Sequence, residues 1–554
     1  MLEHWDVVIV GAGPAGLFAA RELALRSELR VLVLEMGPDL PARLADPGLR
    51  TSGFGGAGAF SDGKLTLSPT YGGRLARLVG TRIDELITDV DDVFLELGAP
   101  RRVHGSDPAA VAELAQRASA AGMTLLPAKI RHIGTDHLPA LLERLRGQLP
   151  PERVRIRTGV AAEHLAAEHG RLLGVIADGH LIAAPNVLIA PGRAGADWVD
   201  AEATRLRIPA SRNLVDIGLR VECHARILAP LTDPLYEFKL RYRSPTFGDG
   251  VRTFCVCPHG EVALEPYDDV VTINGHSNAA RRTANTNFAV LVTTRFTEPF
   301  HQPIAYGRHV ARLANMLGGT AIVQRLGDLL AGRRSTPERI ARGAVRPTLA
   351  QATPGDLAFV LPYRYLTDIL QLLQAIDTLA PGLWADDTLL YGVEAKFYSA
   401  ELRLSPQLET PIPGLYGAGD GAGVSRGLVQ AAASGIVAAR AITAYSRRPQ
   451  GAGSARRSRP AGASAGRSAP ERPSAGRENA GPSALATPPD HTHAQDGGAR
   501  RSRAGGSHDG LHVQPRTTRQ VHPISVDRAA PGAAWALDGR RPDHRRAGSG
   551  DLGG

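Results

Sequence analysis

The chain has 554 residues, 43% of them hydrophobic, and a formal net charge of +9 at pH 7. This length and composition predict about two to four domains with large cores. No run of about eighteen apolar residues occurs, and Glu3 and Asp6 stand where a secretory signal would be basic and then apolar. We therefore expect a cytoplasmic protein without a membrane span. Three cysteines, Cys223, Cys255 and Cys257, cannot make a disulfide framework.

Most of the positive charge lies in the C-terminal segment, because residues 451–554 hold 16 Arg, no Lys and only 9 acidic residues. Residues 447–554 are rich in Arg, Ala, Gly, Ser and Pro and cannot bury enough apolar surface to offset chain entropy, so we expect a disordered basic tail. Clustered arginines would also suit nucleic acid. Aromatic residues are not interleaved with them and acids are mixed in, so nucleic-acid binding is the weaker interpretation.

The first motif opens the chain. Val7–Val10 is a β-branched run typical of a strand that is buried on both faces. Gly11, Gly13 and Gly16 follow with the spacing G-x-G-x-x-G, and a helix and a second strand come next. The three glycines permit a tight turn, a close approach to a pyrophosphate and helix–strand packing. Glu35 ends the second strand, where a carboxylate can hold ribose hydroxyls.

Residues 51–67 form a second glycine-rich stretch, which is too rich in glycine to be a helix or strand by itself. A flexible linker is one interpretation. Phe54, Phe60, Asp62 and Lys64 argue against it, since Gly/Ser linkers do not carry such residues. We expect this backbone to lie close to something flat.

The next part of the chain alternates helices and strands. The spacing of apolar residues predicts helices over residues 74–97, 108–121 and 138–149. Ser106–Pro108 is the expected cap of the second helix. Four short strands predict a β-meander over residues 154–157, 159–165, 172–177 and 180–184. Asn186–Ala190 is then a buried strand that ends in a glycine turn at Gly192, where open α/β sheets bind ligands.

The character changes at about residue 214. Strands are predicted at 215–221, 236–242, 253–257 and 270–274, and helices at 303–316 and 364–379. We therefore predict an inserted α+β substrate domain over 214–380. The nucleotide-binding domain would consist of 1–213 and 381–446, and the tail would be 447–554.

A third glycine-rich motif begins near Gly414. A short strand meets a turn that carries Gly419 and Asp420, and a second turn at Gly427 and Leu428 opens a helix. Asp420 can accept hydrogen bonds from ribityl or ribose hydroxyls, and the helix N-terminus can stabilise negative charge. A plain loop before a C-terminal helix is the alternative interpretation.

Together these stretches resemble the FAD-dependent oxidoreductases, and more narrowly a poorly characterised group of FAD-dependent dehydrogenases. The resemblance covers about residues 5–445 and rests on G-x-G-P-A-G at Gly11–Gly16, Gly53–Lys64, Ala190–Arg193, Phe254–Glu261, Gly392–Tyr398 and Leu415–Gly423. It implies a Rossmann-like FAD-binding domain of the α/β class with a β-meander, FAD in an extended conformation, and the ring beneath the second domain. It implies no substrate.

The residues expected to bind FAD come from all these stretches. They are Gly11, Gly13, Pro14, Ala15, Gly16, Glu35, Gly55, Gly56, Ser61, Lys64, Val160, Gly192, Gly419, Asp420, Gly427 and Leu428, with Val160 assigned to the adenine by family likeness. A second G-x-G-x-x-G is missing, so no dedicated NAD(P)H domain is predicted, although NAD(P)H could reach the second domain as a transient hydride donor.

The catalytic residues stay open at this point. Lys64 would favour the reduced flavin if it lay near the ring, but a surface lysine is an equal alternative. Cys255 and Cys257 would share one face of a strand, where small apolar fillers are the favoured interpretation over a redox pair. His259 and His276 are expected to be loop histidines without a role. No metal-ligand spacing is present.

Three functions remain in competition. The first is an FAD-dependent oxidoreductase that moves a hydride between a small organic substrate and the flavin. The second is a flavin-dependent enzyme that acts on nucleic acid or a nucleotide and is recruited by the basic tail. The third is a nucleotide-binding protein without redox turnover.

Overall fold

A computed structural model describes residues 3–211, 215–267, 269–294, 296, 299–300 and 302–447. Residues 448–554, which make up nearly all of the tail predicted to be disordered, lie outside the described part. The two lobes both lie within the first unit of the chain, residues 1–458.

A parallel five-stranded sheet forms the centre of the first lobe. Its strands, in spatial order, are β23 (Leu415–Gly417), β11 (Asn186–Ile189), β2 (Val7–Val10), β3 (Val31–Glu35) and β7 (Val154–Thr158). Every residue of β2, β3, β11 and β23 is buried, as continuous apolar runs in a covered parallel sheet should be. The Rossmann-like α/β fold predicted for this part is confirmed.

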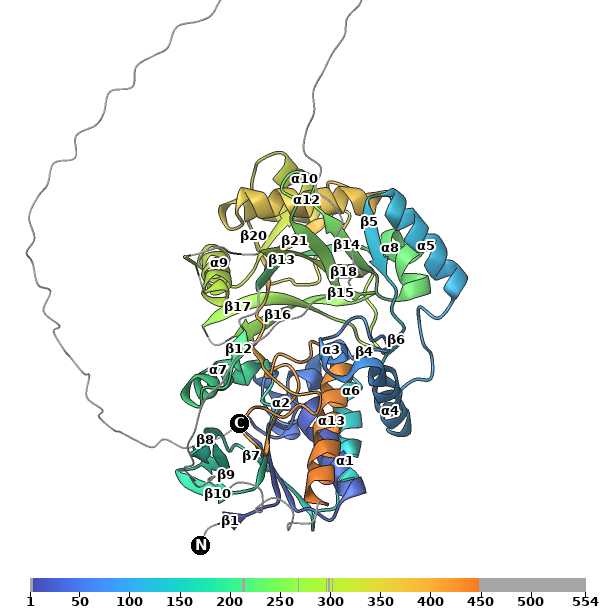
Figure 1. Cartoon of the computed structure of the whole chain (residues 1–554). Helices are drawn as coiled ribbons and strands as arrows, with labels where there is room; N and C mark the ends of the chain where they lie inside the picture. Colours follow the sequence, from blue (N-terminus) through green and yellow to red (C-terminus); the bar gives the residue numbers. More distant parts are fainter. Residues whose placement is uncertain are drawn as a thin grey trace, which may run out of the picture. The chain divides into compact units, whose positions relative to one another are not determined.

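Helices α1 (Pro14–Arg26) and α13 (Leu428–Ser446) pack side by side in this lobe (Figure 1). Their backbones approach closely at Gly435, where a Cβ atom would lie 2.0 Å from the Ala15 carbonyl oxygen. By length and composition α13 could cross a membrane, but 72% of its apolar window is buried in the protein. In this lobe α13 is a core helix, which packs against α1 and against α4 (Ile83–Glu96).

The predicted four-stranded meander is wrong in its first strand. The three later strands form a small sheet with the N-terminal strand, in the order β1 (Glu3–His4), β10 (His180–Ala183), β9 (Arg171–Ala177) and β8 (Ala162–Glu168). Residues 154–158 instead join the parallel sheet as β7, because Val31–Glu35 offers them an open strand edge.

The second lobe is built on an eight-stranded mixed sheet (Figure 1). Its order is β20 (Thr353–Pro354), β19 (Ile322–Arg325), β21 (Leu389–Lys396), β13 (Val215–His224), β18 (Asn285–Thr294), β15 (Gly250–Cys257), β14 (Lys239–Arg243) and β5 (Met123–Leu126). This sheet extends beyond the predicted limits of 214 and 380. β5 comes from before the limit and pairs with the edge strand β14, and β21 comes from after it and pairs with both β13 and β19.

Three further strand pairs and the remaining helices complete the described part. The pairs are β4 (Lys64–Thr66) with β6 (Ile130–His132), β16 (Glu261–Tyr267) with β17 (Val270–His276), and β12 (Ala210–Ser211) with β22 (Glu401–Leu402). The remaining helices are α2 (Leu40–Ala45), α3 (Leu75–Val79), α5 (Pro108–Ala120), α6 (Leu138–Gly147), α7 (Ala196–Arg205), α8 (Ala225–Leu235), α9 (Pro303–Gly318), α10 (Leu326–Leu330), α11 (Pro337–Arg342) and α12 (Tyr363–Asp377). The helix predicted over 74–97 is interrupted at Gly80, whose φ is +62°. The predicted cap of the next helix is provided by Asp107, which accepts from Ala109 N at 2.9 Å.

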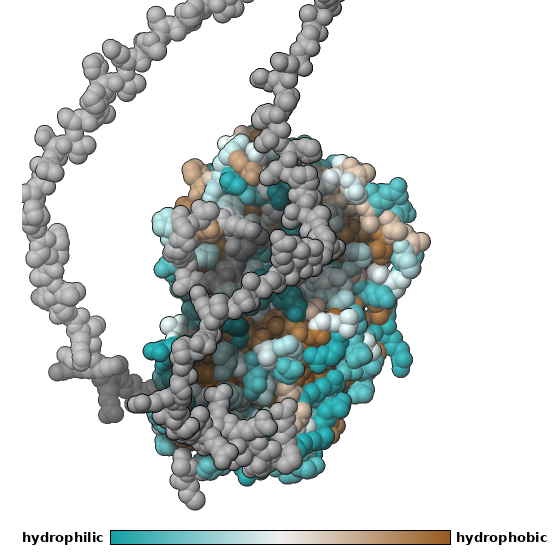
Figure 2. All heavy atoms as spheres, viewed as in Figure 1, coloured by the Kyte–Doolittle hydropathy of each residue, from teal (hydrophilic) through white to brown (hydrophobic). Residues whose placement is uncertain are grey.

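Each lobe has its own large hydrophobic cluster. The cluster of the first lobe surrounds the parallel sheet, and that of the second lies where α8 and α12 pack against β13 and β18. On the face seen in Figure 2, hydrophilic residues cover most of the coloured rim and hydrophobic residues show in the recessed middle.

A fully buried ion pair crosses the second sheet. Arg220 on β13 forms two bonds with Glu394 on β21, at 2.7 and 2.9 Å, and both side chains are 0% exposed. The same guanidinium donates to Asn287 Oδ1 at 2.7 Å and to the Cys255 carbonyl oxygen at 3.2 Å. Arg220 therefore ties its own strand to β21, β18 and β15 and fixes the backbone at Cys255.

The stability of this lobe depends on pH through Asp368 on α12. Burial, aided by the nearby Asp249 carboxylate and opposed by Ser244 and Arg364, raises the pKa of Asp368 to about 6. The folded chain therefore binds more protons than the unfolded chain between about pH 4 and 6, so stability falls as pH rises through that window.

We predict that Asp368→Asn removes this loss of stability. The variant should match the wild type near pH 4 and unfold at a higher temperature above pH 6, as measured by thermal denaturation across the pH range. Asp200→Asn, at an exposed position, is the control and should follow the wild type. A wild-type advantage over Asp368→Asn above pH 6 would contradict the prediction.

Candidate functional site

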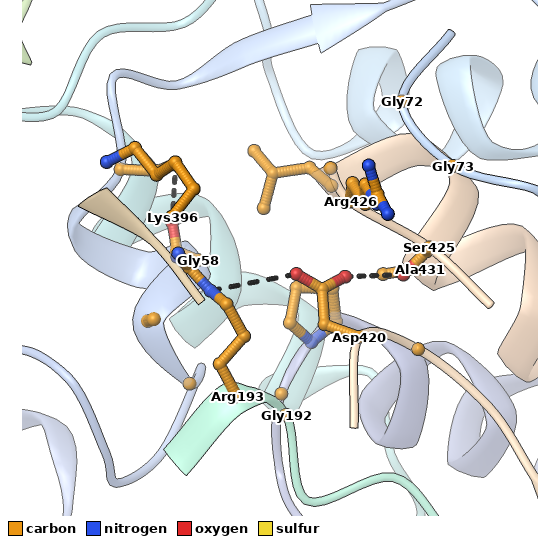
Figure 3. A pocket seen from close by; sticks show the side chains of 18 of the residues that line it. Gly58, Gly72, Gly73, Gly192, Arg193, Lys396, Asp420, Ser425, Arg426 and Ala431 are labelled. Carbon is orange, nitrogen blue, oxygen red and sulfur yellow. Dashed lines mark hydrogen bonds and ion pairs between the residues drawn. The ribbon is translucent and has the colours of Figure 1, made fainter. Parts of the chain in front are cut away.

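A cavity of about 410 Å³ joins the two lobes, and both glycine turns line it. Figure 3 shows part of its wall, with Asp420 between Arg193 and Ser425. Most of the residues predicted for the site meet here, namely Gly11, Gly13, Pro14, Ala15, Glu35, Gly56, Ser61, Lys64, Gly192, Gly419, Asp420, Gly427 and Leu428. Three predicted residues, Gly16, Gly55 and Val160, are not part of the lining.

The first turn depends on two close backbone approaches. Gly11 has φ of +106°, and a Cβ atom there would lie 2.3 Å from the Ala190 carbonyl oxygen. A Cβ at Gly16 would lie 2.0 Å from the Gly11 carbonyl oxygen, so Gly16 serves packing behind the cavity. Gly13 differs from both, because a Cβ there meets no heavy atom nearer than 3.9 Å.

The Glu35 carboxylate holds three backbone segments at one end of the cavity. It accepts from Ala12 N at 2.8 Å, and from Gly37 N and Gly53 N at 3.0 Å each. It thereby joins the first turn to the glycine-rich stretch. Val160 lies behind Glu35, since its amide donates to the Glu35 carbonyl oxygen at 3.0 Å.

The glycine-rich stretch is an ordered part of the wall, so a flexible linker is excluded. Buried Arg43 donates to the carbonyl oxygens of Leu49, Arg50, Phe54 and Gly56. Burial lowers the pKa of this guanidinium to about 10. Gly55 lies behind the lining and donates to the Ala12 carbonyl oxygen at 2.8 Å. Nothing in the sequence marked Arg43, which lies on the short helix α2.

The second turn lies near the first because β23 and β2, the strands that lead into the two turns, flank β11 in the same parallel sheet. The Asp420 carboxylate accepts from the Ser425 hydroxyl at 2.6 Å and lies 3.8 Å from Arg193 Nε (Figure 3). Burial raises the pKa of Asp420 above its ordinary value, although Arg193 opposes this shift.

Lys64 is buried, so of the two alternatives for this residue the surface lysine is excluded. Its Nζ atom lies 2.8 Å from both Asp62 Oδ2 and Glu237 Oε2 and donates to the Val256 carbonyl oxygen at 2.7 Å. Burial disfavours the ammonium form, but the attraction of Asp62 and other acidic neighbours outweighs it and raises the pKa of Lys64. Burial alone would raise the pKa of Asp62, but the nearby Lys64 ammonium lowers it to about 2.

Cys255 lines the cavity and is not an apolar filler, contrary to the prediction. Its Sγ donates to Asp62 Oδ2 at 2.9 Å and lies 3.9 Å from Lys64 Nζ. The backbone of Cys255 has φ of +48°, within a β-bulge between Phe254 and Cys257. This bulge breaks the strand alternation that would have placed both cysteines on one face. Cys257 is fully buried, and all three cysteines are free.

The two histidines differ in position. His259 lies outside the lining, with Nδ1 3.0 Å from the Thr283 carbonyl oxygen. His276 at the end of β17 does line the cavity, so the expectation that it has no place in the site is wrong. Among the described residues, no group of three or more His, Cys, Asp or Glu is arranged to hold a metal ion.

The family comparisons agree with this geometry. Residues 217–397 match the model of the FAD-dependent protein C-terminal domain, and residues 9–54 match the NAD(P)-binding Rossmann-like domain. Two separate parts of the chain are thus similar to domains of FAD-dependent and dinucleotide-binding proteins. Over 471 residues, 78% of this chain and 80% of the relative, it is 29% identical to an uncharacterized protein of Clostridium beijerinckii.

Solved structures are similar to this chain at lower identity. Glycine oxidase from Geobacillus kaustophilus is 13% identical with a TM-score of 0.35, covering 79% of this chain and 95% of its own. L-Proline dehydrogenase from P. horikoshii is also 13% identical with a TM-score of 0.39, covering 80% and 95%.

Several lining residues were not among those predicted for the site. They include Arg193, Lys239, Arg252, Lys396, Tyr398 and Arg426. Three of them, Lys239, Arg252 and Lys396, lie on strands of the second lobe, and only the folded sheet brings them to one wall.

We predict that Lys64→Met strongly destabilises the folded chain. Loss of the ammonium leaves the buried Asp62 carboxylate without its cation and leaves Glu237 with Lys239 alone, which costs about 3–5 kcal/mol. The measurement is the free energy of unfolding from urea denaturation. Lys129→Met is the matched control, since Lys129 is exposed, and its free energy should stay near the wild-type value. Equal stability of the two variants would contradict the described network.

Proposed function

We propose that one FAD molecule lies along the cavity and that a hydride passes between its ring and a small organic substrate beneath the second sheet. The observation that carries this proposal is the single cavity lined by both glycine turns and by residues of the second lobe. Gly13 and Asp420, which are far apart in the sequence, line the same space.

The lining suits the anionic part of FAD. The N-cap residues of helices α1 and α13 are Gly13 and Gly427, and neither helix has a side-chain cap. The first N–H groups of both helices are therefore free to meet a ligand. At α1, the open space around Gly13 and the positive end of the helix dipole favour the pyrophosphate there.

We assign the other predicted residues to successive parts of FAD along the length of the cavity. Glu35 would hold the adenosine ribose with the lone pairs that its three backbone bonds leave free, and Val160 would lie near the adenine. Asp420 and Ser61 would bind ribityl hydroxyls. Lys64 and Leu428 would lie at the ring, where FAD, once bound, supplies a two-electron hydride acceptor or donor.

The chain would exclude water and hold a proton at the reacting end. The second lobe covers this end with Phe254, Cys255 and Tyr398. The Cys255 thiol carries a proton that it shares with Asp62, and Lys64 holds Asp62 in place. We propose that Cys255 Sγ exchanges this proton with the substrate.

The electron donor and the cellular location are further parts of the proposal. Because the Rossmann-like match covers only residues 9–54, which belong to the FAD motif, we propose that NAD(P)H binds transiently in the second lobe. We also propose that the enzyme acts in the cytoplasm.

The direct test is the absorption spectrum of the purified full chain, followed by anaerobic titration with NADH, NADPH and a panel of small organic substrates. We expect the bands of oxidised flavin, the release of FAD on heating, and bleaching by at least one of these reductants. A colourless protein that cannot be loaded with FAD, or a bound flavin that none of them bleaches, would overturn the proposal.

We predict that Gly13→Ala abolishes FAD binding and leaves the fold intact. The folded chain has room for the new methyl group, but a bound pyrophosphate would not. The measurements are FAD content and the melting temperature of the FAD-free chain. Gly147→Ala, at the end of α6 with nothing within 4 Å of the added Cβ, should retain FAD. Normal FAD content in Gly13→Ala would contradict the assignment.

A further inference from the structure

Five of the seven Lys and Arg residues that line the cavity have a carboxylate partner, and a sixth, Arg241, is exposed. Lys64 and Lys239 share Glu237, and Lys396 lies 3.0 Å from Glu265 and 3.1 Å from Glu394. Two arginines are also paired, Arg193 with Asp420 and Arg252 with Asp216. The positive charges of these five residues are therefore compensated by carboxylates of the protein itself.

Arg426 differs from these five. It lies in the turn before α13 and lines the cavity, and its backbone amide is held by the Gly72 carbonyl oxygen at 2.8 Å. Its guanidinium forms no ion pair or hydrogen bond with any described residue. The Cζ atom instead lies 3.7 Å from the centroid of the Tyr398 ring. A stacked guanidinium keeps its N–H donors at the edge of its plane free for a ligand.

Tyr398 is a rigid support for Arg426. Its hydroxyl donates to Asp216 Oδ2 at 2.7 Å and accepts from Arg252 at 2.9 Å. The nearby Phe254 ring also lines the cavity, between Lys239 at 4.3 Å and Arg252 at 4.8 Å from its centroid. The wall next to Arg426 therefore offers one free cation and two fixed aromatic rings.

We infer that Arg426 binds the carboxylate of the substrate and that the substrate is a small organic acid whose apolar body packs against Phe254 and Tyr398. This inference rests on the proposed function, since it places the substrate at the reacting end of the cavity. The guanidinium fork matches the two oxygens of a carboxylate, and such a charge-assisted pair also fixes the orientation of the substrate.

The test titrates the FAD-loaded full chain with carboxylates and their neutral amides, and follows the flavin absorption spectrum. The probes are formate, benzoate and phenylacetate, compared with formamide, benzamide and phenylacetamide. We expect benzoate or phenylacetate to perturb the spectrum with saturation, and the amides to bind about tenfold more weakly or not at all.

Arg426→Gln should weaken the binding of the carboxylates about tenfold or more and leave that of the amides unchanged. Arg426→Lys should recover part of the affinity. Arg403→Gln is the matched control, because Arg403 is exposed and outside the lining, and it should bind like the wild type.

Three results would overturn the inference while the chain still binds FAD. The first is that no carboxylate perturbs the flavin. The second is that Arg426→Gln binds carboxylates as tightly as the wild type. The third is that this variant loses FAD or shifts the flavin reduction potential without any change in carboxylate affinity, which would place Arg426 on the flavin itself. A chain that takes up no FAD would instead defeat the proposed function.

Discussion

The buried amino group of Lys64 is the interaction on which the site depends. Asp62 reaches it from the glycine-rich stretch of the first lobe, and Glu237 reaches it from the second lobe. Lys64 also donates to the backbone of the strand that carries Cys255. One ammonium group therefore holds both walls of the cavity together, and its burial makes the arrangement sensitive to the loss of any partner.

The opposite side of the cavity depends on backbone geometry. β2, β11 and β23 are adjacent parallel strands, so the turns that follow them emerge at one edge of the sheet. Gly11 permits the first turn to pass against Ala190, and Gly435 permits α13 to lie against α1. Two uncapped helix N-termini consequently open on one space, which is the electrostatic condition for an anionic cofactor.

Much of this arrangement could be predicted from local patterns in the sequence. The spacing of Gly11, Gly13 and Gly16, the position of Glu35 and the turn at Asp420 each have a short-range signal, and most of these residues do line the cavity. The partners of Lys64 had no such signal, because Glu237 lies far along the chain on the other lobe. The β-bulge at Cys255 was also unpredictable, since Phe254–Cys257 has the composition of an ordinary strand. The second sheet crosses the predicted domain limits of 214 and 380 for a similar reason. The strands with which β5 and β21 pair depend on which strand edges are open after folding.

The central claim is that FAD runs from Glu35 to the wall formed by Lys64 and Cys255. A crystal structure of the full chain with bound FAD tests it most directly. The account predicts adenosine beside Glu35 and Gly53, pyrophosphate against the backbone at Gly13, and the ring between Leu428 and the Lys64–Cys255 wall. A cofactor in the reverse orientation, or one bound outside this cavity, would contradict the account.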